Sequence, residues 1–74
     1  MSKYLQSILN LLDKTKRHVT IHTADYPFES LFRIGKKLKQ QDKTMTLVVD
    51  RELTDFQIEQ LIEASDDRFN IKFD

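Results

Sequence analysis

The segment from Thr44 to Asp67 constrains the fold more than any other part of this chain. It begins with an apolar run, Leu47-Val48-Val49, passes through a short polar turn and ends in an amphipathic helical pattern. A continuous apolar run of this length is typical of a central strand. Because strands that are joined through helices are normally parallel, the segment predicts a parallel sheet packed against helices.

The helical part of this segment has well-marked ends. Thr54 is a favourable N-cap, and Gln57, three residues later, completes a capping box. We therefore predict a helix from Asp55 to Ser65. Its predicted inner face consists of Ile58, Leu61, Ile62 and Ser65. Leu53 and Phe56 are expected to anchor the entry of the helix.

The rest of the chain continues the alternation of helices and strands. Apolar residues recur at helical spacing in 3–16 and 27–40, and they alternate with polar residues in 18–24 and 68–74. With the segment above, the predicted order is helix 3–16, strand 18–24, helix 27–40, strand 44–50, helix 55–65 and strand 68–74. The other residues expected to face the core are Tyr4, Leu5, Ile8, Leu9, Leu11, Leu12, Thr15, Val19, Ile21, Phe28, Leu31, Phe32, Gly35, Leu38, Phe69, Ile71 and Phe73.

This order predicts one α/β domain over residues 1–74, built as a two-layer α-β-α-β-α-β sandwich. Three helices should cover one face of a small, mainly parallel, three-stranded sheet, and the other face should be largely polar. Two sheet edges would stay open, and these are natural pairing sites for a second copy of the chain. The residues expected on the uncovered face are Thr20, His22, Thr46, Val48, Asn70 and Lys72.

Composition argues against several classes of protein. The chain has 74 residues, one glycine and no cysteine, which excludes disulfide frameworks, thiolate metal sites and glycine-rich phosphate-binding motifs. His18 and His22 lie four residues apart in a predicted strand, a spacing of about 13 Å that does not suit one metal ion. No apolar run is long enough to span a bilayer. We therefore expect no enzymatic activity, metal or cofactor, and no membrane association.

The net charge is zero, but the two halves of the chain carry opposite charge. Residues 1–43 are basic, whereas residues 44–74 are acidic. In the acidic half, Asp55, Glu59 and Glu63 line one ridge of the predicted helix, and Asp66 and Asp67 follow it. These five residues, here called the acidic ridge, fit either a solvated helix face or a surface that imitates phosphates towards a basic partner.

The basic half offers a second ridge, formed by Arg33, Lys36 and Lys37 with Lys39 and Lys43 nearby. It fits either a solvated face or a nucleic-acid-associated regulator that contacts phosphates. No aromatic residue is expected within it, so a base-stacking platform is not indicated. Since a polyanion-binding domain normally has a net basic charge, direct nucleic-acid binding is not the favoured interpretation.

Residues 6–12 contain a short pattern of another kind. Gln6, Leu9 and Leu11 match the Gln-x-x-Leu-x-Leu-Phe type of peptide by which many replication proteins hold the bacterial sliding clamp, with Leu12 in place of the final Phe. Such peptides bind in an extended form, whereas the same residues fit the apolar face of the first predicted helix. The pattern therefore has two interpretations, a clamp-binding peptide and a core helix.

Taken as a whole, the chain resembles the very small proteins that lytic bacteriophages use to disable host machinery. Its size, lack of cysteine, split charge and lack of catalytic motifs are similar to those of a staphylococcal-phage inhibitor of the DNA polymerase III sliding clamp. The resemblance implies a homodimer in the host cytoplasm that occupies the DNA channel of the clamp and blocks its loading onto DNA. The acidic ridge would be the partner-binding surface. Another DNA-binding host protein, such as a CRISPR nuclease, would fit the same ridge.

Overall fold

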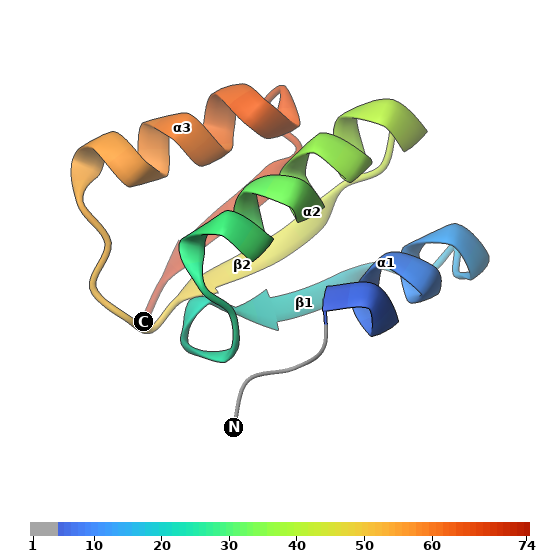
Figure 1. Cartoon of the computed structure of the whole chain (residues 1–74), viewed down its shortest axis with the longest axis horizontal. Coiled ribbons are helices and arrows are strands. Elements are labelled where there is room, and N and C mark those ends of the chain that lie inside the picture. Colours follow the sequence, from blue (N-terminus) through green and yellow to red (C-terminus); the bar gives the residue numbers. More distant parts are fainter. Residues whose placement is uncertain (1–4) are drawn as a thin grey trace.

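A computed structural model gives the structure of the protein, and it describes residues 5–74 (Figure 1). These residues form three α-helices and three β-strands in the predicted order, and one short 3₁₀ helix that was not predicted. The α-helices are α1 (Leu5–Lys14), α2 (Phe28–Gln41) and α3 (Asp55–Ser65), the strands are β1 (Val19–His22), β2 (Met45–Val49) and β3 (Phe69–Phe73), and the 3₁₀ helix is Thr23–Asp25. Residues 3 and 4 of the first predicted helix, including the proposed core residue Tyr4, lie outside the described residues.

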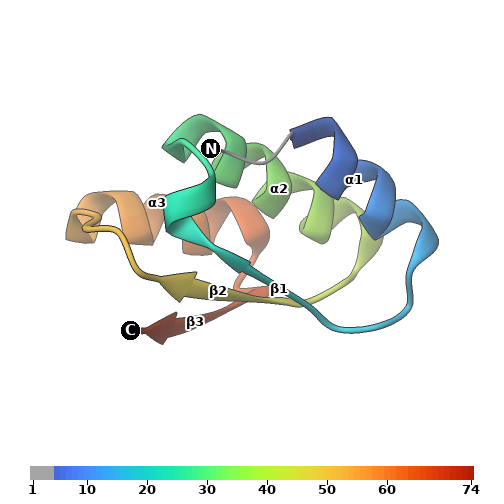
Figure 2. The same ribbon diagram turned by 90° about the horizontal axis from the view of Figure 1, so that it is seen from below.

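The three strands form one parallel sheet in the order β1-β2-β3. Figure 2 shows α1, α2 and α3 on the same side of this sheet, which leaves the opposite face uncovered. The predicted two-layer α/β sandwich is therefore confirmed. The uncovered face carries the predicted side chains in two rows across the strands, Thr20 beside Thr46 and Asn70, and His22 beside Val48 and Lys72.

The core lies between the helices and the sheet. The side chains of Leu31, Ile34 and Leu38 on α2 are fully buried against Leu47 of β2 and Leu61 of α3, which belong to the same cluster. Each of these positions was predicted except Ile34. Burial of a side chain of this size stabilises the fold by roughly 1.5–3 kcal/mol, which is a large contribution in so small a domain.

The single glycine allows α2 to pack closely on α3 and β3. A Cβ atom on Gly35 would stand 3.0 Å from Cε2 of Phe69 and 3.3 Å from Cβ of Ser65. Ser65 is itself fully buried, and its hydroxyl donates a 2.8 Å hydrogen bond to the carbonyl of Leu61. Small residues at this crossing therefore determine how closely α2 and α3 can approach each other.

The structure corrects the predicted end of the first strand. The strand was expected to continue to Ala24, but β1 ends at His22, and a 3₁₀ helix begins at Thr23. The buried hydroxyl of Thr23 accepts hydrogen bonds from the amides of Asp50 (3.2 Å) and Arg51 (3.0 Å). Because these partners lie beyond the end of β2, the chain turns inward at Thr23, where an extended strand would have continued along the sheet edge.

Three residues assigned to the core are exposed. Phe56 and Phe73 are each 68% exposed, and Leu11 is 46% exposed. Phe56 precedes the buried Leu61 by five residues, a rotation of about 140° that takes it to the outer side of α3. Phe73 is the last residue of the edge strand β3, and no element among residues 5–74 covers it. Leu11 directly precedes the buried Leu12, so its side chain leaves α1 about 100° away from the core.

Candidate partner-binding surface

The acidic ridge lies on the outer side of α3. Asp55, Glu59 and Glu63 are exposed, whereas Leu61 and Ser65 are buried on the opposite side of the helix. The Thr54 side chain accepts a hydrogen bond from the amide of Gln57 (3.1 Å), and the Gln57 side chain accepts one from the amide of Thr54 (3.0 Å). The predicted capping box is therefore present, and it holds the first turn of the helix in place.

Asp66 and Asp67 extend the ridge beyond the C-terminal end of α3. Both are exposed and adopt left-handed backbone conformations, with φ of 54° and 61°. The amide of Asp67 donates to the carbonyl of Ile62 (2.9 Å), so the turn is closed by hydrogen bonds. Negative charge at a helix C-terminus opposes the helix dipole. Unlike Asp55 in the first turn, these two carboxylates are therefore not favoured by the helix dipole, although aspartate is one of the few residues that tolerates a left-handed conformation.

The five carboxylates of the acidic ridge have no ion-pair partner within residues 5–74. The ion pairs in this part of the chain join Asp13 to Lys37 and Asp42 to Arg68, and Asp50 is hydrogen-bonded to His22. These three acidic side chains hold neighbouring elements together, whereas the carboxylates of the acidic ridge, like Asp25, Glu29, Glu52 and Asp74, make no ion pair within residues 5–74. The ridge is a surface whose negative charge is available to a partner.

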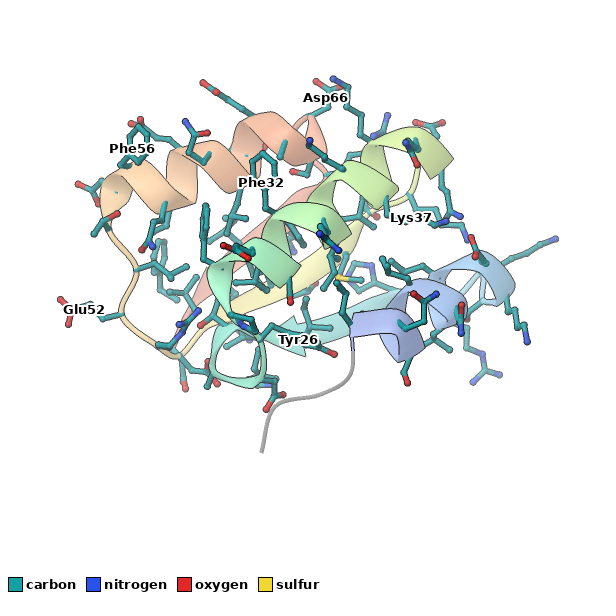
Figure 3. All side chains as sticks on the ribbon, viewed as in Figure 1. Tyr26, Phe32, Lys37, Glu52, Phe56 and Asp66 are labelled. Carbon is teal, nitrogen blue, oxygen red and sulfur yellow. The ribbon has the colours of Figure 1, made fainter. Side chains whose placement is uncertain are left out.

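Phe56 lies on the same side of α3 as the ridge. It precedes Glu59, Gln60 and Glu63 by three, four and seven residues, which places all four on one helix face. Figure 3 shows Phe56 projecting from the outer side of α3, with Asp66 at the far end of the helix. The sequence pattern wrongly assigned Phe56 to the core, although its spacing from Leu61 is a signal that it points outward.

Most residues of the basic ridge, on and just after α2, make contacts within the fold. Lys37 pairs with Asp13 of α1 (3.1 Å), and Figure 3 shows Lys37 on the side of α2 near α1. The Lys43 ammonium donates to the carbonyls of Leu12 and Thr15 at the end of α1. Of the five basic residues, only Arg33 and Lys39 make no ion pair, side-chain hydrogen bond or cation–π contact with another residue of the 5–74 segment.

An aromatic pair interrupts this basic ridge, contrary to the prediction. The Lys36 ammonium lies 4.8 Å from the centre of the Phe32 ring, and the rings of Phe28 and Phe32 are 6.2 Å apart. Together with Glu29 and Arg33 these residues line a hollow of about 340 Å³ on α2. Helical spacing places Phe28 and Phe32 one turn apart and Lys36 one turn further. The basic surface of α2 therefore includes two partly exposed rings.

A polar cluster joins the carboxyl ends of β1 and β2. The carboxylate of Asp50 accepts hydrogen bonds from the amide of Ala24 (2.9 Å), the hydroxyl of Thr23 (3.1 Å) and Nδ1 of His22 (2.9 Å). These bonds, with that from the Ala24 amide the strongest, hold the pKa of Asp50 below its ordinary value of 3.8. Because the buried Thr23 hydroxyl is engaged in three hydrogen bonds, the cluster acts as a structural link between the strands.

The side chains of His18 and His22 have different hydrogen-bond partners. His22 bonds to Asp50, whereas Nε2 of His18 bonds to the hydroxyl of Thr46. Within residues 5–74 no group of three or more histidine or acidic side chains is arranged to hold a metal ion. The described helices also include none that is long and apolar enough to cross a membrane.

Residues 6–12 belong to α1 and are not extended. Ile8 and Leu12 are buried in the core, and the side chain of Gln6 donates a 3.1 Å hydrogen bond to that of Asn10 within the helix. Binding in the extended form of a clamp-binding peptide would require α1 to leave the core. The core-helix interpretation of this segment therefore holds in this structure.

Comparisons with known proteins found no match. No family model, curated protein sequence or solved structure matches the chain. The physical character of the surfaces described above is therefore the basis for assigning a function.

Proposed function

We propose that this protein is a non-enzymatic inhibitor that binds the DNA-binding surface of a host protein through the acidic ridge. The observation that supports this most directly is the set of exposed carboxylates on α3 without an ion-pair partner in residues 5–74. A surface that normally holds DNA is lined by Lys and Arg, and it attracts a row of carboxylates for the same electrostatic reason.

The bacterial sliding clamp is the target that we propose, on the basis of the resemblance to phage clamp inhibitors. The clamp encircles DNA and therefore has a basic channel, which the acidic ridge could occupy in competition with DNA. Occupation of the channel would stop the clamp from being loaded and would block host replication. Such an inhibitor would act in the cytoplasm of the host cell.

We further propose that the protein acts as a homodimer. The sheet has two edges, β1 and β3, whose outer backbone groups have no strand partner among residues 5–74. A second copy could pair with either edge, and the resulting dimer would present two acidic ridges. Two ridges on one rigid body bind a ring-shaped partner more tightly than one, because the second contact is made at high effective concentration.

The test is to measure the affinity of the purified protein for a purified bacterial sliding clamp, together with its effect on clamp loading. The double variant Glu59→Lys/Glu63→Lys should bind about 100-fold more weakly, which is roughly 2.7 kcal/mol, because two attractive charges become repulsive. The control Glu29→Lys/Asp74→Lys makes the same change in net charge at exposed positions outside the acidic ridge, and its affinity should change little. Equal effects of both variants would remove the acidic ridge from the mechanism.

The cluster of Phe28, Phe32, Arg33 and Lys36 favours one alternative, a nucleic-acid-associated regulator. Rings beside cations can stack on unpaired bases while the cations meet phosphates. In that case the protein should bind single-stranded DNA or RNA at low salt, and Arg33→Ala/Lys36→Ala should weaken that binding. Lack of binding at low salt would eliminate this alternative.

A further inference from the structure

We propose that Phe56 is the apolar anchor of the acidic ridge, so the partner surface combines an apolar pocket with surrounding Lys and Arg side chains. This inference rests on the proposed function, since it concerns the same face of α3. An apolar anchor restricts the kind of partner more than the negative charge of the acidic ridge does alone. The occupant of this face is a folded protein surface, and not a polyamine or a loosely attracted cation.

The exposure of Phe56 is the first reason. The ring is 68% exposed, and within residues 5–74 the other exposed large apolar side chains are Leu11 and Phe73. Covering a phenyl group of this kind gains about 1.5–3 kcal/mol, so its exposure is unfavourable unless something covers it. A surface that imitated only DNA would need carboxylates and would gain nothing from an aromatic ring at this position.

The rigid backbone under Phe56 is the second reason. It is the second residue of α3, inside the turn held by the reciprocal hydrogen bonds between Thr54 and Gln57. A side chain on a capped helix loses little backbone freedom when it is bound. Such preorganisation is a common property of residues that contribute strongly to binding.

The surroundings of Phe56 are the third reason. Glu59 and Gln60 lie one turn further along the same helix face, Glu63 lies two turns further, and Asp55 directly precedes Phe56 in the first turn. An aromatic residue surrounded by polar groups is the usual arrangement at the centre of a protein interface, where the polar rim excludes water from the anchor. The carboxylates require cations in the partner, and the phenyl ring requires an apolar pocket, whose rim cations can also contact the ring face.

The two kinds of contact should respond differently to salt. Attraction between exposed charges is screened over about 8 Å at physiological ionic strength, whereas burial of a phenyl ring is not. Loss of Phe56 should therefore weaken binding by a similar factor at low and high salt. Loss of the ridge carboxylates should weaken binding mainly at low salt.

The chain itself provides a matched control. Phe73 on β3 is as exposed as Phe56, at 68%, but it lies in the sheet layer and not on the outer face of α3. Phe56→Ala and Phe73→Ala remove the same atoms from equally exposed positions. Since neither side chain is in the core, both variants should fold, which is checked by their amide spectra and thermal unfolding.

The experiment is an NMR titration of the protein and both variants with two synthetic peptides. One peptide is eight lysines, and the other is a helical peptide of eight lysines interrupted by leucines. The wild-type protein should prefer the leucine-containing peptide about tenfold, with amide shifts along α3. Phe56→Ala should lose the preference, and Phe73→Ala should keep it. Equal affinity for both peptides, loss of the preference in Phe73→Ala alone, or no binding of either peptide would overturn the proposal.

The same variants tested against the sliding clamp separate this inference from the proposed function. If the leucine-containing peptide is preferred through Phe56 but the clamp is not bound, the clamp is the wrong target and the description of the surface stands. If the clamp is bound equally well by Phe56→Ala and wild type, the anchor is disproved and the inhibitor function stands. If Phe56→Ala alone converts a dimer to a monomer in analytical ultracentrifugation, Phe56 contacts a second copy and the proposal is wrong.

Discussion

Helices α2 and α3 cover the same face of the sheet and pack against each other, and each carries a row of like charges, but the two rows are used differently. On α2, Lys37 is paired with Asp13, and Lys36 lies over the ring of Phe32. On α3, the carboxylates of Asp55, Glu59 and Glu63 make no ion pair within residues 5–74. Part of the charge of α2, on Lys36 and Lys37, thus serves the fold, while the charge of α3 is available to a partner.

This difference shows that the number of charges on a helix is a poor guide to its function. Both rows have the same helical spacing, and both fit a solvated face equally well from sequence alone. What separates them is the set of neighbours that the fold supplies. Because α2 packs beside α1, Lys37 of α2 meets the carboxylate of Asp13, and Lys43, which follows α2, bonds to a carbonyl near the end of α1. The outer side of α3 has no such neighbour among the described elements.

The largest expected effect comes from separating the two helices. Gly35→Leu places a large side chain where even a Cβ atom would meet the Phe69 ring at 3.0 Å. Because the residues around it are fully buried, the variant should lose about 3 kcal/mol of unfolding free energy. The control Gln40→Leu adds the same side chain at an exposed position of α2. Urea denaturation measures both, and equal stability of the two variants would contradict the close crossing of α2 and α3.

A smaller effect should follow from removing the cap of α3. Thr54→Ala deletes the hydroxyl that accepts the amide of Gln57 and should lower the unfolding free energy by about 1 kcal/mol. If the acidic ridge binds as a rigid surface, the variant should also bind the clamp more weakly, because the first turn must be ordered on binding. Ser30→Ala, at a half-buried position on α2, is the control. Clamp affinity equal to that of wild type would show that the order of this turn does not matter.

Asp50 is an acidic residue that stabilises the fold, in contrast to the carboxylates of the acidic ridge. Its pKa is held low by hydrogen bonds from Ala24, His22 and Thr23, so the carboxylate is favoured in the folded state. That contribution to stability is present above the ordinary pKa of 3.8 and is lost as the pH falls through the lower pKa of the folded state. Asp50→Asn should therefore lower the Tm at pH 7 and flatten its dependence on pH below about 4. Glu59→Gln should leave both unchanged.

The smallest expected effect concerns the ion pair between α1 and α2. Hydrogen bonds from Lys37 and Gln41 lower the pKa of Asp13, so this contribution too is lost as the pH falls below about 4. Lys37→Ala should lower the Tm slightly at pH 7 and less at a pH below the lowered pKa of Asp13 in the folded state. Lys39→Ala removes the same charge from α2 without a partner and should change the Tm at neither pH. Equal shifts in both variants at pH 7 would mean that the pairing of Lys37 contributes nothing.

Much of the fold could be predicted from the sequence because its determinants are local. The capping box of Thr54 and Gln57 located the start of α3, and the apolar run at Leu47 identified the central strand. The alternation in 68–74 placed Asn70 and Lys72 on the uncovered face, as found. Each of these signals lies within a few residues of the element that it determines.

The surface was harder to predict because its properties depend on residues that are distant in the chain. The end of β1 at His22 is set by Thr23 meeting Asp50 and Arg51 beyond the end of β2. The contacts of Lys43 depend on the end of α1. Phe56 is an exception, since helical spacing alone would have shown that it points outward.

The sequence by itself determined the order of helices and strands, the parallel sheet and the position of five carboxylates along and after one helix, because periodicity and capping act over one or two turns. Only the tertiary structure decided which charges are neutralised within the fold. That outcome depends on which helix ends and side chains pack together, as Lys37 and Asp13 do. The same packing leaves the carboxylates of α3 and the ring of Phe56 together on a face that the described residues do not cover.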